Sequence, residues 1–207
     1  MAIALDHVLW AVPDLDAGSA LFERLTGVAP IIGGRHPGFG TRNALSGLTA
    51  TTYVEIIAPD PEQDLTGTMG AGIAALPQPQ MLTFALACDD LAAIRRRAED
   101  GGITVEDPIP MSRKTPEGVQ LNWTIMRLAD PRWPGRLPFF IDWEGSPHPA
   151  GTTPGGTTLE RFVALDPDAA GLQAVYDTIG CPVPVQAGAT TGFVGTFATP
   201  NGTVVLT

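Results

Sequence analysis

Cysteine and basic residues are both scarce in this chain of 207 residues. The two cysteines, Cys88 and Cys181, lie far apart, so they form neither a paired zinc motif nor a disulfide framework. Twelve Lys and Arg against 22 Asp and Glu give a formal net charge of −10, which repels phosphate backbones and anionic lipids. The basic cluster Arg95 to Arg97 stands beside Glu99 and Asp100 in a helical pattern. We therefore expect neither nucleic acid nor a membrane as a partner.

Long apolar runs and nucleotide-binding motifs are absent as well. No apolar run reaches the length that crosses a bilayer, and no basic segment with an apolar stretch and cleavage site opens the chain. We therefore expect a cytoplasmic protein. There is no Walker loop, dinucleotide-binding glycine pattern or nucleophile elbow. The pairs Gly33-Gly34 and Gly155-Gly156 are interpreted as turns rather than phosphate cradles.

Glycine and proline, by contrast, are plentiful: 24 Gly and 20 Pro make up more than a fifth of the chain. This composition is typical of short elements joined by tight turns, and favours strands over long helices. The first strand is predicted from Ile3 to Val12, where a nearly unbroken apolar run precedes Pro13-Asp14. Alternation along it places His7 among aliphatic side chains on one face.

The predicted elements repeat three times in the order strand, helix, three strands. The first repeat has strands at 3–12, 29–32, 40–48 and 51–58, with a helix that starts at Leu15 and stops at Gly27. The second has strands at 81–88, 103–109, 119–128 and 137–143 and a helix at 91–99; the third has strands at 158–165, 183–186, 193–199 and 203–206 and a helix at 169–179. We expect boundaries at 1–60, 80–150 and 157–207, with a linker at 61–79 that has a weak helical signal.

This order predicts an α+β protein of repeated βαβββ units. A helix covers one face of each sheet, so the other face is buried by a second sheet or left as a concave ligand surface. We therefore expect cupped mixed β-sheets with helices packed outside.

A histidine in the first strand and a glutamate in the fourth give this unit a recognisable form. It resembles the vicinal oxygen chelate (glyoxalase/bleomycin resistance/dioxygenase) superfamily and, more narrowly, the glyoxalase-like domain family. The stretches that carry the resemblance are 5–15, 40–44, 53–59 and 138–143. It covers most of the chain up to about Pro149 and implies the vicinal oxygen chelate fold.

The resemblance also implies a divalent metal ion (Zn, Mn, Ni or Fe(II)), held by a first-strand and a fourth-strand ligand from each half of a paired cup. These positions are His7 and Glu55 in the first repeat, and Thr83 and Asp142 in the second. Because threonine replaces the second histidine, the full set of four ligands is absent. The third repeat has Arg161 in its first strand and no carboxylate in its last.

His148, in a loop stiffened by flanking prolines, is a further candidate ligand. Two imidazoles and one carboxylate with open positions suit Fe(II), Mn(II) or Zn(II). Simpler interpretations stay open: His7 as a core histidine bonded to a backbone carbonyl, Asp142 as an edge carboxylate in water, and His148 as a surface residue. His36 is interpreted as an ordinary loop residue.

Strand residues beside the expected cup are candidates for binding substrate. Arg42, Asn43 and Asn122 are polar groups that can orient a carbonyl or carboxylate, with Trp123 and Trp143 as apolar walls. Strand Asn and Trp residues also serve sheet edges and cores, so this structural alternative remains. Glu55 or Asp142 is a candidate general base if it does not bind the metal.

The resemblance implies a metal-dependent lyase or isomerase acting on a small oxygenated metabolite, in which the metal stabilises a developing enolate. Two alternatives stay open. A non-catalytic, small-molecule binding or sequestering protein of the bleomycin-resistance type is favoured by Thr83, and a ring-cleaving dioxygenase would need redox-active iron. Units of this type bury their open sheet faces in pairs, and three repeats leave one unpaired within the chain. We therefore also expect a homodimer whose interface includes the apolar residues between Phe193 and Leu206.

Overall fold

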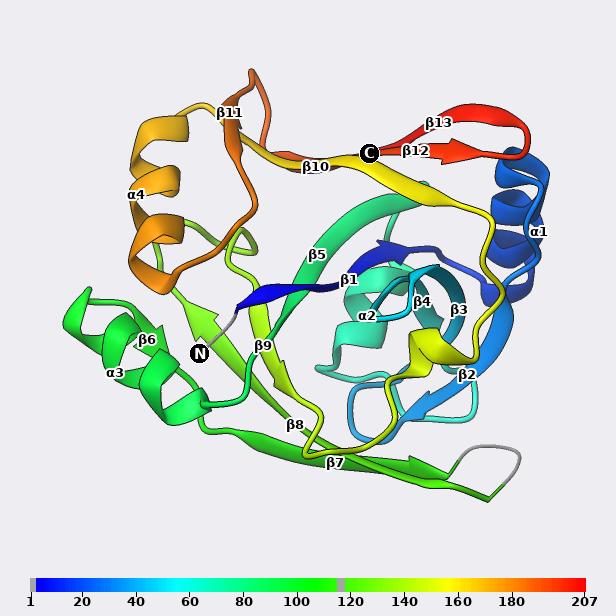
Figure 1. Ribbon diagram of the computed structural model, residues 1–207, viewed down its shortest axis with the longest axis horizontal. Helices are drawn as coiled ribbons and strands as arrows, with labels where there is room; N and C mark the ends of the chain where they lie inside the picture. Colours follow the sequence, from blue (N-terminus) through cyan, green and yellow to red (C-terminus); the bar gives the residue numbers. More distant parts are fainter. Residues whose placement is uncertain (1–2, 115–117) are drawn as a thin grey trace. The chain divides into compact units, whose positions relative to one another are not determined.

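The computed structural model describes residues 3–114 and 118–207 and has an α+β architecture with curved mixed sheets (Figure 1). Its elements, in chain order, are β1 (Ala4–Ala11), α1 (Leu15–Thr26), β2 (Ile31–His36), β3 (Thr41–Thr49), β4 (Thr52–Pro59), α2 (Met69–Ala74), β5 (Gln80–Ala87), α3 (Leu91–Asp100), β6 (Thr104–Val105), β7 (Ile109–Lys114), β8 (Gln120–Ala129), β9 (Phe139–Asp142), the 3₁₀ turn η1 (Pro149–Gly151), β10 (Thr158–Asp166), α4 (Ala169–Ile179), β11 (Val185–Ala187), β12 (Gly192–Thr199) and β13 (Gly202–Leu206). The predicted repeats of strand, helix and further strands are confirmed, with one additional short strand in the second repeat.

Helix ends follow local signals in the sequence. Asp14, Asp90 and Asp168 each precede a helix, and each carboxylate accepts the backbone N–H three positions further on. Gly27 and Gly180 end α1 and α4 with φ values of 77° and 72°, a left-handed conformation that glycine adopts without steric cost. The helix boundaries were therefore predictable to within about a residue.

The chain divides into two compact units, each made of three segments. Unit 1 contains the chain up to His7 together with Thr83–His148 and Phe162–Phe193. Unit 2 contains Val8–Leu82, Pro149–Arg161 and Val194–Thr207. The division falls inside strands β1, β5, β10 and β12, so these strands contribute residues to both units.

Unit 1 contains a mixed sheet in the order β5-β9-β8-β6, with β7 also paired to β8. β5 and β9 run parallel, while β8 is antiparallel to β6, β7 and β9. Helices α3 and α4 lie side by side (Figure 1). Phe84 lies in an aromatic cluster, 5.3 Å from Phe162, 5.6 Å from Phe193 and 6.0 Å from Tyr176 between ring centroids, all edge to face. This cluster forms a buried core for the unit.

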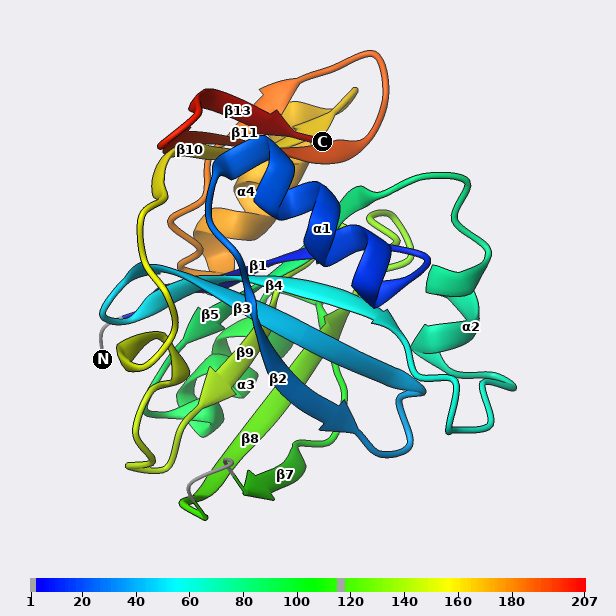
Figure 2. The same ribbon diagram turned by 90° about the vertical axis from the view of Figure 1, so that its right-hand side faces the viewer.

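Unit 2 contains strands in the order β2-β3-β4-β1, with β3 antiparallel to both β2 and β4. Helix α1 lies over β3 and β4 (Figure 2). The helix contains Gly18, where a Cβ atom would overlap the side chain of Val12, so glycine permits this close approach. The hairpin of β12 and β13 turns at Pro200 and Asn201, one residue earlier than the predicted Asn201-Gly202, because Gly202 already pairs with Thr199.

The interpretation of Gly33-Gly34 as a turn was wrong. Strand β2 runs through both glycines to His36 and has a bulge between Ile32 and Gly34. The backbone N–H of Gly34 donates to Asn43 Oδ1 over 2.8 Å, and a Cβ atom on Gly33 would overlap the same oxygen. The glycines thus allow β2 to approach an asparagine side chain, and His36 belongs to a strand rather than to a loop.

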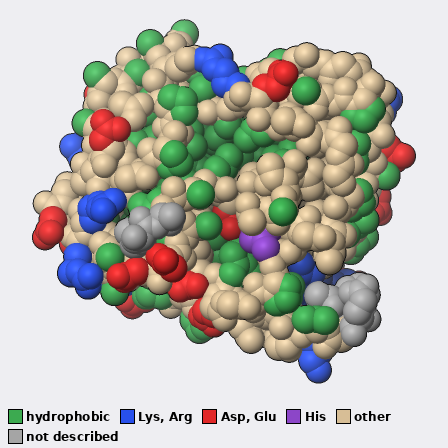
Figure 3. All heavy atoms as spheres, in the orientation of Figure 1, with side chains coloured by type: hydrophobic (Ala, Val, Ile, Leu, Met, Phe, Trp, Pro, Cys, Tyr) green, Lys and Arg blue, Asp and Glu red, His purple; other side chains and the backbone are tan. Residues whose placement is uncertain are grey.

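On the face drawn in Figure 3, Lys and Arg side chains are scattered rather than gathered into a patch. Within 3–114 and 118–207, every helix is too short or too polar to cross a bilayer.

Candidate active site

Asp6 is the centre of a buried polar network in unit 1. Its side chain has no exposed surface, and its carboxylate contacts three ring nitrogens. Oδ1 lies 2.6 Å from His7 Nδ1, while Oδ2 lies 2.9 Å from Trp143 Nε1 and 3.1 Å from His148 Nε2. A buried carboxylate is costly without such partners, and this one has contacts at both oxygens.

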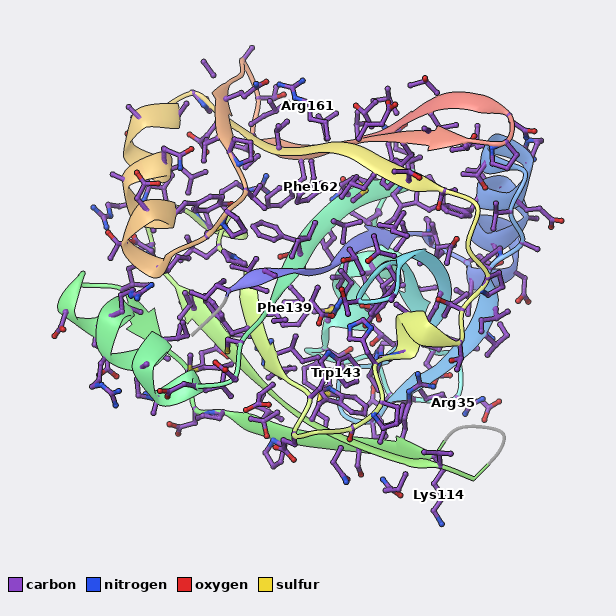
Figure 4. The ribbon with its side chains drawn as sticks, viewed as in Figure 1. Arg35, Lys114, Phe139, Trp143, Arg161 and Phe162 are labelled. Carbon is purple, nitrogen blue, oxygen red and sulfur yellow. The ribbon has the colours of Figure 1, made fainter. Side chains whose placement is uncertain are left out.

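Aromatic rings surround this network. The ring centroid of Trp143 lies 5.2 Å from that of His148 and 5.6 Å from that of Trp123. The imidazole of His7 meets the ring of Phe139 edge to face at 5.5 Å. Phe139 begins β9 and Trp143 follows its last residue, so this one short strand supplies two of the rings (Figure 4). Apolar ring faces therefore enclose the charged centre.

The pKa of Asp6 is set by two opposing effects. Burial alone raises the pKa of this carboxyl group. Hydrogen bonds from His148 and His7, and the positive charge of these rings when protonated, oppose burial and hold the pKa well below its usual range. Asp6 is therefore a carboxylate at neutral pH.

Four residues expected at the site from the sequence thus contribute to one cluster in unit 1: His7, Trp123, Trp143 and His148. Asp6, to which three of them are bonded, was not predicted as a site residue. Its only signal in the sequence was an acidic side chain interrupting an apolar strand, directly before a histidine.

Two other expected residues of unit 1 have different partners. Asp142, half-buried at the end of β9, accepts the backbone N–H of Glu144 over 2.9 Å. Asn122 is exposed on β8, and both its backbone N–H and its carbonyl bond to the hydroxyl of Ser146 over 2.8 Å. The proposed roles of Asp142 in catalysis or metal binding, and of Asn122 in substrate binding, stay predictions.

Unit 2 contains a second buried carboxylate, Glu55 on β4. Its side chain is 6% exposed, and Oε1 accepts a hydrogen bond from Asn43 Nδ2 over 2.6 Å. His36 Nε2 lies 3.7 Å from the same oxygen, and His36 Nδ1 lies 2.9 Å from Thr41 Oγ1. His36 was not predicted as a site residue, because the two glycines before it suggested a loop.

The orientation of the Asn43 amide follows from its contacts. The backbone N–H of Gly34 can only donate, so the oxygen of Asn43 faces β2 and its NH₂ group faces Glu55. Arg42, the residue before Asn43 on β3, is half-buried. Burial raises the pKa of Asp60, but hydrogen bonds from Gln63 and from the backbone of Glu62 lower it overall, with a minor contribution from the positive charge of Arg42. Binding of substrate by Arg42 or Asn43 stays a prediction.

Members of the vicinal oxygen chelate superfamily commonly bind divalent metals. His7 fits a ligand role. A metal-bound imidazole usually donates the N–H of its other ring nitrogen to a carboxylate, and Nδ1 of His7 is hydrogen-bonded to Asp6 in this way. Taken separately, neither unit places three or more His, Cys, Asp or Glu residues to hold a metal ion within the described ranges.

The repeated units and curved mixed sheets define a protein of the vicinal oxygen chelate class. The model of the glyoxalase-like domain family matches residues 5–180, and the chain belongs to this family. No curated protein matches the sequence.

Solved structures share this fold at low sequence identity. A hypothetical protein from Staphylococcus aureus is 18% identical, with a TM-score of 0.71 over 99% of this chain and 84% of that chain. A methylmalonyl-CoA epimerase in complex with methylmalonyl-CoA and NH4+ is 19% identical, with a TM-score of 0.52 over 72% of this chain and 100% of that one. A variant of the Streptomyces coelicolor methylmalonyl-CoA epimerase in complex with 2-nitronate-propionyl-CoA is 20% identical, with a TM-score of 0.52 over 70% of this chain and 98% of that chain. These similarities show the fold.

Proposed function

We propose that this protein is an isomerase or lyase that transfers a proton at a carbon next to a carbonyl group in a small oxygenated metabolite. The observation that carries the proposal is Glu55, a buried carboxylate with Asn43 bonded to one of its oxygens. Membership of the glyoxalase-like family supports this class of chemistry. The epimerases of similar fold suggest acyl thioesters as the first substrates to test.

Glu55 is the proposed general base. A carboxylate accepts a proton only along a suitable direction, so its orientation has to be fixed before the substrate arrives. The 2.6 Å bond from Asn43 restricts the rotation of the carboxylate, and the amide is itself fixed by Gly34. Burial also excludes the bulk water that would compete for the proton.

A divalent ion is the proposed cofactor, either Zn, Mn, Ni or Fe(II). His7 is the ligand that the geometry supports, while Glu55, Asp142 and His148 are further candidates from the family resemblance. When bound, such an ion polarises a carbonyl oxygen and stabilises the negative charge that forms on proton removal. Asp142 is the alternative base if Glu55 is a ligand.

Exchange of hydrogen for deuterium tests the proposed reaction. Methylmalonyl-CoA and a set of small 2-oxo acids would be incubated with the enzyme in D₂O, with the α-carbon followed by NMR. We expect Glu55→Gln to slow exchange by about 10²–10⁴-fold, the usual effect of losing a general base. Glu23→Gln, an exposed carboxylate change on α1, is the matched control. Equal rates in Glu55→Gln and the parent protein would refute the role of Glu55.

The main alternative is a binding protein that performs no reaction. It is supported by Thr83, which in this family resemblance replaces a ligand histidine and here lies half-buried on β5. Metal analysis of protein purified without chelators, with thermal-shift measurements on adding Zn, Mn, Ni or Fe(II), separates the two. If no metal is bound, the melting temperature does not shift on adding metal, and no deuterium enters the substrates, the binding protein is favoured. Oxygen uptake with bound iron would instead indicate the dioxygenase.

A further inference from the structure

We propose that Asp6 is a positioning residue that fixes the tautomers of two histidines in opposite senses. His7 then carries its proton on Nδ1 and acts through Nε2, while His148 carries its proton on Nε2 and acts through Nδ1. The whole assembly lies in unit 1. The inference does not depend on the reaction proposed above, because it concerns the ring nitrogens themselves.

The assignment follows from what each group can donate or accept. An ionised carboxylate only accepts hydrogen bonds, and the indole nitrogen of a tryptophan only donates. Trp143 therefore donates to Oδ2, at 2.9 Å. His148 contacts this same oxygen at 3.1 Å and His7 contacts Oδ1 at 2.6 Å, so each must present an N–H there.

The consequence for each ring follows from the chemistry of imidazole. A neutral ring has one N–H and one nitrogen with a lone pair. Asp6 accepts a hydrogen bond from Nδ1 of His7 and from Nε2 of His148. In the neutral rings the lone pair is therefore on Nε2 of His7 and on Nδ1 of His148. If His7 takes a metal ion or a proton, it therefore does so at Nε2, and His148 at Nδ1.

Trp143 holds Asp6 in place in this assembly. Its N–H occupies Oδ2, and its ring lies against both His148 and Trp123. A carboxylate held by an indole cannot rotate without breaking that bond. The sequence separation of Asp6 and Trp143, 137 residues, makes this a tertiary rather than a local constraint.

Nitrogen NMR of the imidazole rings tests the inference directly. Protein labelled with ¹⁵N-histidine would be measured at about pH 8.5, where an unperturbed imidazole is neutral. Signals would be assigned with the single variants His7→Gln, His36→Gln and His148→Gln. We expect a protonated-type signal for Nδ1 and a lone-pair-type signal for Nε2 in His7, and the reverse in His148.

The variant Asp6→Asn tests whether the Asp6 carboxylate fixes the tautomers of His7 and His148. Asn in place of Asp6 offers one acceptor and one NH₂ donor, so it cannot accept at both positions. We expect Asp6→Asn to change the tautomer of at least one of these histidines and to leave the signals of His36 unchanged. Asp16→Asn, at an exposed position of α1, is the control and should leave the tautomers of all three histidines unchanged.

The wild-type spectrum alone can overturn the proposal, so it stays falsifiable even if Asp6→Asn does not fold. A proton on Nε2 of His7, a proton on Nδ1 of His148, or two protons on either ring would each refute it. Unchanged tautomers in a folded Asp6→Asn protein would show that Asp6 is not what fixes them.

Discussion

At the scale of single residues, the buried thiols show how strongly this interior disfavours charge. Burial raises the pKa of Cys181 to about 12 and that of Cys88 to about 11. In both cases the thiol form is stabilised, since the thiolate would be desolvated. Neither cysteine has the lowered pKa of a nucleophile, which agrees with placing the chemistry on carboxylates and imidazoles.

We therefore expect both thiols to react slowly with iodoacetamide in the native protein. The thiolate is the reactive form, so a raised pKa lowers the rate at pH 8 and the rate keeps rising until the pH approaches 11 or 12. Mass spectrometry of alkylated peptides would measure it, with guanidinium-unfolded protein as the control. Native rates that level off near pH 8.5, as for an ordinary cysteine, would contradict this expectation.

Single residues were also where sequence reasoning reached its limit. Period-2 alternation places His7 and Glu55 on strands, and both lie on strands in the structure. Alternation cannot say which distant side chain each will meet. Asp6 was missed because its partners Trp143 and His148 come from 137 and 142 residues away, and only the folded chain brings them together.

At the scale of elements, the bulge in β2 can be tested by a single substitution at Gly33. We expect Gly33→Ala to destabilise the protein by about 1–3 kcal/mol, because the new Cβ atom would overlap Asn43 Oδ1 and lie 3.0 Å from Leu45 Cγ. The same change would displace Asn43 from Glu55, so proton exchange should fall as well. Thermal unfolding and the deuterium assay measure the two effects.

Gly72→Ala is the matched control for this substitution. Gly72 lies within α2, and no atom lies within 4 Å of where its Cβ would be. Alanine is favoured over glycine in a helix interior by about 1 kcal/mol, so this variant should be as stable as the parent or more so. Equal melting temperatures for Gly33→Ala and the parent would show that the bulge tolerates a side chain.

Element order was the part of the fold that the sequence predicted well. Aspartate caps, glycine stops and apolar periodicity are local signals, and the helices lie where those signals placed them. Glycine pairs are ambiguous between turns and close approach, which explains the error at Gly33-Gly34. The strand predicted at 103–109 is formed only at β6, Thr104–Val105. Pro108 has no N–H to donate, and the next strand, β7, begins at Ile109 and extends beyond the predicted range to Lys114.

At the scale of the whole molecule, assembly is the open prediction. We propose a homodimer that uses β13, the edge strand of its sheet, where Val205 is 55% exposed. Phe193, Phe197 and Leu206, which were expected to contribute, are instead buried within the chain. A two-fold contact would therefore use Val205 and its neighbours on that edge.

Light scattering at micromolar concentration tests this assembly. A homodimer has twice the chain mass of 21.7 kDa, and Val205→Lys should shift the protein toward the single-chain mass. Val119→Lys, which changes another exposed valine, should leave the mass unchanged. A mass near 22 kDa for the parent protein at all concentrations would remove the proposal.

The segmented make-up of the two units has a consequence for how the protein is made. Unit 2 begins at Val8 and includes Val194–Thr207, so it cannot be completed until Thr207 has been synthesised. At about 5–20 residues per second, translation from Val8 to Thr207 takes roughly 10–40 s. During that time the early strands lack their late partners, and their apolar faces are exposed to other nascent chains. Unit 2 therefore folds only late in the synthesis of these residues, and chaperones that shield such strands are expected to govern its yield in the cell.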